Sequence, residues 1–499
     1  MRDHIFFLLN GSPIHATGRE ALSMLAPFLR QSRGLTGTKI ACAQGACGSC
    51  TVLLGRPVEG SPDFDYAPIN SCILPVTNCD GCHVITVEGV NGAEHAGGGA
   101  DETTLSPVQS ALVNCHGAQC GFCTPGMVLT LTAWREQQGK ANALHDGANG
   151  AHTEADLRED VTKALEGNLC RCTGYAPIVE AALHIEAGGL PLNEWYPPEE
   201  LRAHLRDCAQ EEVSIAVPAD SVQGAQTLYA PATWDDALKW KAAHEDATAL
   251  SGGSEIGVLM NTKGLAPQEV LSLTRVEGLD KVAVDDGHLV LGGGANWLQV
   301  AEVARTALPE FARLLARWGS PQLRRAGTVA GNLVRASPLS DSLPLLLVCE
   351  ALIELESASG RRLVLVDEFL GEDGPTLRST ELVRRVRVPL PPPDVTLRLI
   401  KVSKRRAFDR SIVSAAFWLR REGDTIAEAR LAYGGVGPRT LRLPKTEEGL
   451  RGAPLAPDTW RDAGSKAVEE VSSKDDPTST YQYRDRLVAN LLRKFGAEL

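Results

Sequence analysis

The cysteines are the feature that most constrains this chain. Eleven of the 13 lie between residues 42 and 172, and the other two, Cys208 and Cys349, stand alone. A chain of 499 residues can bury a sizeable core without disulfides. Cysteines crowded into one third of a chain are typical of metal, cluster or redox chemistry. We therefore expect metal centres in the first third and a different role for the rest.

The first motif is Cys42-x4-Cys47-x2-Cys50, with Cys72 further on. Three thiolates from one tight loop and a fourth from a distant segment hold the [2Fe–2S] cluster of plant-type ferredoxins. Residues 45–49 are small, which lets backbone N–H groups approach the cluster sulfides. A zinc site is the alternative, but zinc sites favour paired C-x2-C elements. The spacing predicts these four cysteines as ligands of a first [2Fe–2S] cluster.

The second motif offers five thiols for four positions: Cys115-x4-Cys120-x2-Cys123 and Cys170-x-Cys172. Both short pairs lie where predicted helices begin or end. Helix N-termini favour anionic clusters because their free N–H groups point outwards. We therefore favour a second cluster held by Cys120, Cys123, Cys170 and Cys172, with Cys115 as a spare packed thiol.

Hydrophobic periodicity and turn residues suggest five regions. Strands at Ile5–Leu9 and Pro13–His15, joined by an Asn-Gly turn, and a helix over 18–30 begin a small α/β unit. Helices are predicted over 108–115, 126–138, 153–167 and 178–187, with an exposed loop over 139–152. An α+β pattern and a smaller last domain with a helix near 483–495 follow. The predicted domains are 1–91, 92–187, a connector of little periodicity over 188–225, 226–392 and 393–499.

Two glycine-rich segments in the fourth region, 250–257 and 327–332, could bring backbone N–H groups to a pyrophosphate. Ser254, Thr328 and Asn332 add short donors there, and Asp341 could accept from a hydroxyl. Neither segment is G-x-G-x-x-G, so a Rossmann site is not indicated. No Walker A sequence occurs, which argues against ATP.

Charge and hydropathy exclude other classes. The formal net charge of -12 provides no positive field to collect nucleic-acid phosphates. No run approaches 18 consecutive apolar residues, so we expect no membrane span. The N-terminal apolar run is too short for a secretory signal, and we expect a cytoplasmic protein.

The motifs Cys-Gly-Phe-Cys-Thr-Pro-Gly (120–126) and Gly-Asn-Leu-Cys-Arg-Cys-Thr-Gly-Tyr (167–175) resemble the [2Fe–2S] helical domain of the xanthine dehydrogenase family of molybdenum hydroxylases. In that family the C-x2-C and C-x-C pairs are the ligands, which supports the set favoured above. The glycine-rich segments resemble the FAD-binding domain of xanthine dehydrogenases and carbon monoxide dehydrogenase flavoproteins. The resemblance implies FAD contacts at Ala249, Leu250, Ser251, Gly252, Gly253, Ser254, Glu255, Ile256, Trp318, Thr328, Val329, Ala330, Gly331, Asn332, Asp341 and Lys401.

The implied fold is multidomain α+β: a β-grasp ferredoxin-like domain, a four-helix [2Fe–2S]-binding domain, a PCMH-type FAD-binding domain and a small α/β domain like the CO dehydrogenase flavoprotein C-terminus. This order resembles the small iron–sulfur and flavin subunit of bacterial xanthine dehydrogenases. It implies two [2Fe–2S] clusters and FAD in this chain, NAD⁺ as electron acceptor, and no catalytic residue for purine hydroxylation. It also implies a large molybdopterin-binding partner subunit, in a heterodimer or an (αβ)2 heterotetramer.

Two other interpretations stay open from the sequence. The chain could serve a molybdenum hydroxylase that acts on an aldehyde or an N-heterocycle. It could instead be a zinc-stabilised binding protein that uses three C-x2-C pairs, at 47/50, 79/82 and 120/123. Cys79-x2-Cys82 departs from the family pattern, and we interpret this pair as extra core or surface thiols rather than an additional metal site.

Overall fold

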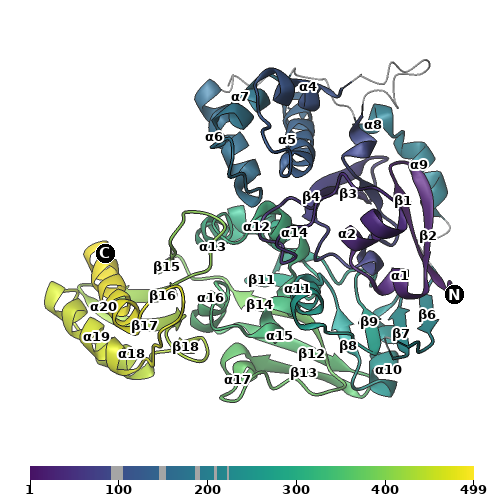
Figure 1. Cartoon of the computed structure of the whole chain (residues 1–499). Helices are drawn as coiled ribbons and strands as arrows, with labels where there is room; N and C mark the ends of the chain where they lie inside the picture. The colour runs from purple at the N-terminus through teal and green to yellow at the C-terminus, as the bar shows by residue number, and fades with distance from the viewer. Residues whose placement is uncertain (92–104, 145–152, 186–191, 207–210, 222–223) are drawn as a thin grey trace. The chain divides into compact units, whose positions relative to one another are not determined.

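The computed structural model of the chain describes every residue except 92–104, 145–152, 186–191, 207–210 and 222–223 (Figure 1). The chain divides into two compact units. Unit 1 comprises Met1–Ala232, Ala247–Arg275 and Ser320–Ala326, and unit 2 comprises Thr233–Asp246, Val276–Gly319 and Gly327–Leu499. Each unit combines sheets and helices, so the predicted multidomain α+β class is confirmed.

Unit 1 holds two sheets, with strand orders β2-β1-β5-β3-β4 and β6-β7-β9-β8. The strands are β1 His4–Leu9, β2 Ser12–Thr17, β3 Thr51–Pro57, β4 Phe64–Asn70, β5 His83–Ile85, β6 Val213–Val217, β7 Gln226–Ala230, β8 Thr248–Leu250 and β9 Glu269–Ser272. The helices and helical turns are α1 Gly18–Leu22, α2 Leu25–Pro27, η1 Phe28–Ser32, η2 Val76–Cys79, η3 Glu88–Val90, α4 Pro107–Asn114, α5 Thr124–Leu144, α6 Glu154–Ala164, η4 Leu165–Gly167, α7 Ala176–Leu183, α8 Leu192–Trp195, α9 Pro198–Leu205, α11 Ser254–Lys263 and α14 Pro321–Ala326.

The predicted N-terminal hairpin is present, but the helix predicted after it is broken. Asn10 (φ 49°) and Gly11 (φ 82°) form a two-residue turn with both residues left-handed, which matches the twist of paired strands. The predicted helix over 18–30 divides at Ser23 and Met24, whose backbone is extended. Val76 N donates to Ser23 O and Leu25 N to Leu74 O at 2.9 and 2.8 Å, so tertiary pairing overrides the helical period there.

The predicted helical domain forms from α4, α5, α6 and α7, which gather together in Figure 1. The expected capping box at Thr153 and Asp156 begins α6 with both reciprocal hydrogen bonds in place. The loop predicted over 139–152 is wrong over 139–144, where α5 continues, because one glycine among good helix formers does not stop it. Residues 145–152 lie outside the described residues.

The connector predicted over 188–225 is instead partly structured, since it contains α8, α9 and β6. Leu201 and Leu205 of α9 are spaced four apart and are 3% and 5% exposed. In β6, three alternate residues, Val213, Ile215 and Val217, are buried in the core. The helical spacing in α9 and the alternation in β6 each extend over only a few residues, which is too short for the sequence to indicate an element there.

Unit 2 also holds two sheets, with strand orders β10-β11-β14-β12-β13 and β15-β16-β17-β18. The strands are β10 Val282–Asp285, β11 His288–Gly292, β12 Leu352–Ser357, β13 Gly360–Leu365, β14 Leu382–Pro389, β15 Val395–Val402, β16 Val413–Glu422, β17 Thr425–Gly434 and β18 Leu441–Arg442. The helices are α10 Trp234–Ala243, α12 Trp297–Ala307, α13 Pro309–Leu315, α15 Val329–Arg335, α16 Leu343–Val348, α17 Val366–Leu370, α18 Pro444–Leu450, α19 Pro457–Glu469 and α20 Tyr481–Ala497.

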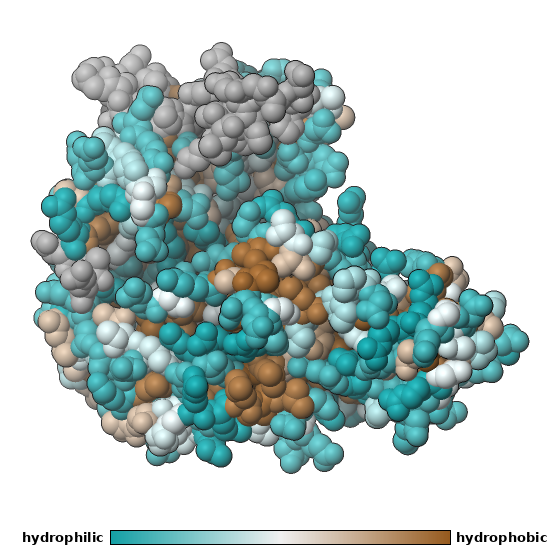
Figure 2. All heavy atoms as spheres, turned by 180° about the vertical axis from the view of Figure 1, so that it is seen from behind, coloured by the Kyte–Doolittle hydropathy of each residue, from teal (hydrophilic) through white to brown (hydrophobic). Residues whose placement is uncertain are grey.

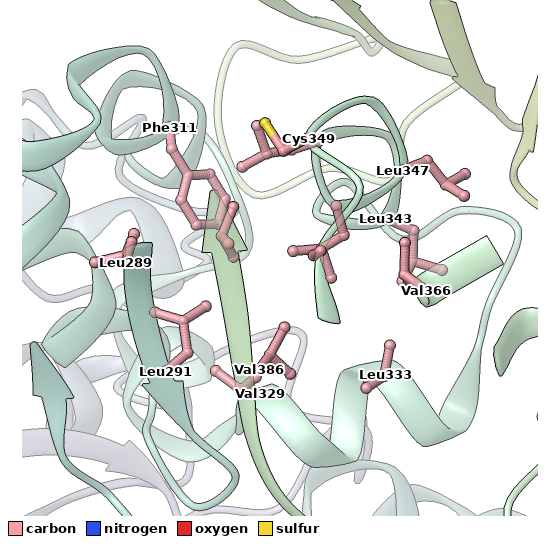
Figure 3. Close-up of a cluster of buried hydrophobic side chains, with 14 of the residues drawn as sticks. Leu289, Leu291, Phe311, Val329, Leu333, Leu343, Leu347, Cys349, Val366 and Val386 are labelled. Carbon is pink, nitrogen blue, oxygen red and sulfur yellow. The ribbon is translucent and has the colours of Figure 1, made fainter. Parts of the chain in front are cut away.

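The main core of unit 2 lies between its first sheet and the helices around it. Figure 3 shows Leu289, Leu291 and Val386 of the sheet on the same side as Phe311, Val329 and Leu333, all of them at most 2% exposed. A second core joins α18, α19 and α20 to β16 and β17. Burial of apolar area on this scale is the dominant stabilising contribution in both regions.

The surface view in Figure 2 is mostly hydrophilic, with a few hydrophobic patches on the face shown. Among the helices that the structure describes, none combines the length and the apolar character that a membrane crossing requires.

Candidate functional site: two cysteine quartets and a divided flavin region

The first quartet lies on the loop before β3 and on the turn after β4. Gln44 N and Ala46 N donate to the Cys42 Sγ at 3.4 and 3.2 Å, so backbone N–H groups already point at sulfur there. Gly45 has φ +69°, and a Cβ at this position would lie 2.5 Å from the Ile73 side chain. The loop therefore forms a close cradle that only small residues fit, as expected for a sulfide-rich cluster.

The thiols of this quartet perturb one another. The Cys42 thiol and burial raise the pKa of Cys47 to about 12. The contact with Cys42 lowers the pKa of Cys72, but the contact with Cys50 and burial together outweigh it. The pKa of Cys72 is therefore raised. Thiols this close cannot all ionise unless positive charge compensates them, and a bound iron pair supplies that charge. The residues present therefore fit a [2Fe–2S] cluster.

The second quartet lies at the start of α5 and on the segment after η4. The Cys172 Sγ is 3.4 Å from the Cys120 Sγ, and Cys123 is close enough to Cys170 for their thiols to share a hydrogen bond. Burial and this Cys170 contact raise the pKa of Cys123 to about 12. Each close pair joins one cysteine of the C-x2-C motif to one of the C-x-C motif. The four residues therefore come together as predicted, although their role as ligands stays a prediction.

A binuclear cluster takes two protein thiolates on each iron. Across the described ranges of the chain, no three His, Cys, Asp or Glu side chains meet the geometry for holding one metal ion.

The two quartets are in direct backbone contact within unit 1. Leu169 N, one residue before Cys170, donates to Cys47 O at 2.8 Å. A Cβ on Gly48 would lie 2.2 Å from Gly167 O, and a Cβ on Gly126 would lie 2.3 Å from Gly48 O. The loop of the first quartet and the segment of the second therefore approach backbone to backbone, with no space for a side chain at Gly48 or Gly126.

The remaining three cysteines of the first third belong to hydrophobic cores or pack against them. Cys79 and Cys82 are 0% and 3% exposed and belong to a hydrophobic core. Cys115 ends α4 and packs against the core shared by the first sheet and the helical domain. These positions match the interpretation of all three as packed thiols. Cys208 lies outside the described residues.

The first glycine-rich segment belongs to unit 1. β8 leads through Ser251 and Gly252 to Gly253, which has φ +75° and precedes α11. The first N–H groups of a helix have no intrahelical acceptor. Those at the start of α11 can therefore donate to a phosphate that lies against this turn. Asn78 holds the turn by donating to Ser251 O at 2.8 Å.

The helix that follows is fixed to the first quartet. Asn261 Nδ2, on α11, donates to Ala43 O at 2.8 Å and to Cys72 O at 2.7 Å. Gly257 lies so close to the turn after β4 that a Cβ would be 2.6 Å from Ile73 O.

The other residues predicted to bind FAD belong to unit 2. Val329 N and Ala330 N donate to Ala295 O and Gly293 O at 2.9 Å, and Thr328 caps α15 by accepting from Gly331 N. The Asn332 Oδ1 accepts from two serine hydroxyls, Ser340 and Ser342. The structure thus uses these groups to fix the loop, and their contact with FAD stays a prediction.

Three further positions are internal to unit 2. Lys401 Nζ lies 2.5 Å from the Asp341 Oδ2 with both side chains at most 2% exposed, and the Ser411 hydroxyl donates to the other Asp341 oxygen. Asp341, for which we expected a ligand hydroxyl as donor, is therefore already paired. Trp318 packs edge-on against Trp297, with ring centroids 4.2 Å apart.

Four family models match consecutive parts of the chain. The 2Fe-2S iron-sulfur cluster binding domain matches residues 7–77, and the [2Fe-2S] binding domain matches 86–183. The FAD binding domain in molybdopterin dehydrogenase matches 221–391, and the CO dehydrogenase flavoprotein C-terminal domain matches 398–499. The chain is therefore an iron–sulfur flavoprotein with two [2Fe–2S] clusters and FAD as its cofactors.

Two named relatives narrow the class of iron–sulfur flavoprotein to which the chain is similar. Xanthine dehydrogenase of Drosophila subobscura and aldehyde oxidase 1 of Bos taurus are each 28% identical, over 98% and 99% of this chain. The chain is homologous to these enzymes and is an iron–sulfur and flavin part of the molybdenum hydroxylase family, as predicted. It spans 39% of the length of each of these two relatives.

Solved structures agree at the level of fold. Carbon monoxide dehydrogenase from Hydrogenophaga pseudoflava aligns with a TM-score of 0.51 and 23% identity, over 54% of this chain and 94% of that one. Quinoline 2-oxidoreductase from Pseudomonas putida 86 aligns with a TM-score of 0.50 over the same shares.

Sequence reasoning missed the residues that hold the quartets in place. Asn168 and Asn261 bind backbone and side-chain groups of the cysteine-bearing segments. Asn168 lies inside the quoted Gly-Asn-Leu-Cys motif, which is the one signal that could have indicated it; nothing in the sequence around Asn261 does so.

Proposed function

We propose that this chain is the iron–sulfur and flavin subunit of a xanthine dehydrogenase. Electrons removed from a purine at a molybdenum cofactor on a partner subunit pass to the helical-domain cluster, then to the ferredoxin-like cluster, then to FAD and finally to NAD⁺. The two clusters carry one electron each, and FAD when bound converts single electrons into the hydride that NAD⁺ accepts.

The observation that carries this proposal is the contact between the two quartets. One hydrogen bond, from Leu169 N to Cys47 O, joins a segment that bears a second-quartet cysteine to a first-quartet cysteine. Exposure supports the direction: Cys120 and Cys172 are exposed, whereas Cys50 and Cys72 are buried. The two exposed thiols of the second quartet suit entry of electrons from a partner, and the two buried thiols of the first suit transfer inside the chain.

The proposed overall reaction balances without a catalytic residue in this chain. Xanthine, water and NAD⁺ give urate, NADH and a proton, with the purine losing two electrons and gaining an oxygen from water. Hypoxanthine would give xanthine in the same way. We assign the hydroxylation to the partner, in a cytoplasmic heterodimer or (αβ)2 heterotetramer, and the electron transfer to this chain.

The purified chain tests this division of labour. We expect about four irons with matching acid-labile sulfide and one flavin per chain. It should oxidise NADH with an artificial electron acceptor, and it should show no turnover of xanthine until a molybdopterin-bearing partner is added. Turnover of xanthine by the chain alone would contradict the proposal, and so would a flavin that NADH cannot reduce.

A second candidate has support from the relatives. Aldehyde oxidase 1 of Bos taurus is as similar to this chain as xanthine dehydrogenase of Drosophila subobscura is, at 28% identity. The partner complex would then oxidise an aldehyde or an N-heterocycle. A substrate screen of the purified complex separates the two candidates: aldehyde turnover without purine turnover would favour the second.

A further inference from the structure

The Asn168 side chain lies between the two cysteine quartets and is 2% exposed. Its Nδ2 donates to Gly48 O at 3.2 Å and to the Thr51 Oγ1 at 3.4 Å. Its Oδ1 accepts from the Thr130 hydroxyl and from the Gln322 Nε2, both at 2.9 Å. One amide therefore joins the loop of the first quartet, helix α5 of the second quartet and helix α14.

The orientation of this amide follows from its partners. Gly48 O can only accept, and Thr51 spends its hydroxyl proton on Gly48 O at 2.7 Å, so Thr51 can only accept from Asn168. The NH2 group must therefore face the first quartet. The carbonyl oxygen must then face Thr130 and Gln322, which both donate. Both donors and both acceptor positions of the side chain are in use, which is the full capacity of an asparagine.

The position of Asn168 in the chain gives this network its significance. Cys170 follows two residues later, while Gly48 follows Cys47 directly. Thr51, Thr130 and Gln322 are each at most 2% exposed, so no water competes for the bonds. The bonds to Gly48 and Thr51 therefore restrain the second quartet relative to the first, and the bonds from Thr130 and Gln322 hold the Asn168 amide in the orientation that makes them.

We propose that Asn168 is a positioning residue that fixes the interval between the two cluster sites. This inference rests on the proposed function, in which electrons cross that interval. Transfer between buried carriers slows steeply as their separation grows, so a polar network that holds two backbones in contact protects the rate. Asn168 acts through the cysteine segments and touches no reacting atom.

The test is Asn168→Ala in the full chain, with Asn261→Ala as a matched control. Asn261 also makes two hydrogen bonds to cysteine segments of the first quartet, but from α11 rather than from the second quartet. With both clusters reduced, the magnetic interaction between their two spins reports the interval by EPR. We expect this splitting to weaken or broaden in Asn168→Ala, with iron content unchanged, and to stay as in the unaltered chain in Asn261→Ala.

A second readout needs no cluster. Hydrogen exchange at the Leu169 amide should become about tenfold faster in Asn168→Ala, because the segment loses four hydrogen bonds, two of which hold it against the loop that bears Cys47. If Asn168→Ala does not accumulate, Gln322→Leu and Thr130→Val each remove one bond to the Asn168 oxygen and should show smaller changes in the same direction.

An unchanged splitting together with unchanged Leu169 exchange would overturn the inference. Equal loss of splitting in the Asn261→Ala control would also overturn it, since the interval would then not depend on Asn168. Absence of clusters in the unaltered chain would instead overturn the proposed function, and the exchange measurement would still decide the role of Asn168.

Discussion

The two cysteine quartets share a spacing motif and differ in their surroundings. In the first, Cys50 and Cys72 are 1% and 2% exposed, and a Cβ added at Gly45 or Gly48 would meet a neighbouring atom at 2.5 or 2.2 Å. In the second, Cys120 and Cys172 are exposed, and a Cβ added at Gly121 or Gly174 would meet nothing within 4 Å. Four cysteines that come together can therefore lie partly inside the protein or partly at its surface. The difference lies in what packs on the loop.

Ligand loss gives the largest expected effect. Cys72→Ser and Cys172→Ser should each remove one cluster, or about two of about four irons, because a [2Fe–2S] cluster needs four protein ligands. Iron and sulfide analysis with EPR shows which cluster is lost. Cys115→Ser is the control and should keep the full iron content. If Cys172→Ser keeps all its iron and an unaltered EPR signal, the second quartet is wrongly assigned.

Thiol accessibility is the next expected difference. In cluster-free protein, an alkylating reagent should modify Cys120 and Cys172 at least about a hundredfold faster than Cys50 and Cys72, because buried thiols react only after local opening. Peptide mass spectrometry over a time course measures the four rates. Similar rates at both quartets would remove the contrast between interior and surface.

The glycines allow a matched comparison of packing. Gly48→Ala should destabilise the protein by about 3 kcal/mol, since its φ of +69° is strained for alanine and its Cβ would meet Gly167 O at 2.2 Å. Gly121→Ala has the same backbone strain at φ +77° but open space, so we expect about 1 kcal/mol. Denaturant unfolding measures both free energies. Equal costs would show that only backbone strain matters at these positions.

A histidine buried in the first quartet's sheet should make the stability of the fold depend on pH. His83 is 0% exposed; its Nε2 accepts from Gly11 N at 3.0 Å, so its Nδ1 carries the proton towards the Tyr66 hydroxyl at 2.7 Å. Burial lowers the pKa of His83 to about 3. Between pH 6.5 and 3 the imidazole of His83 is protonated in the unfolded chain and neutral in the folded one. The free energy of unfolding therefore decreases by about 1.4 kcal/mol for each unit by which the pH is lowered.

Unfolding free energies at pH 7 and pH 5 measure this dependence. His83→Asn should reduce the difference between the two values. A His83→Asn variant with the pH dependence of the unaltered protein would contradict the prediction.

The sequence predicted best what is local. The Asn-Gly hairpin and the capping box at Thr153 each depend on a few neighbouring residues, and they formed as expected. The break at Ser23 depends on pairing with residues 74–76, about fifty positions away. The Asn168 network needs Gly48, Thr130 and Gln322 at once, and no local pattern can indicate three distant partners.

The same limit applies to the predicted flavin contacts. Residues 249–256 lie in unit 1, and the others lie in unit 2. Glycine content indicated both loops, but nothing in the sequence showed that Val329 and Ala330 spend their N–H groups on residues 293–295 or that Asp341 is paired with Lys401.

Unit 1 recruits two stretches from the sequence of the flavin region, Ala247–Arg275 and Ser320–Ala326. A truncation after residue 225 would therefore not yield an intact iron–sulfur fragment. It would delete the strands β7, β8 and β9, strip Asn261 from the backbone beside Cys42 and Cys72, and leave Asn168 without Gln322. A separate iron–sulfur polypeptide would need other residues to make these contacts. Dividing the chain at its apparent domain border therefore requires compensating substitutions on the surface that the division exposes to solvent.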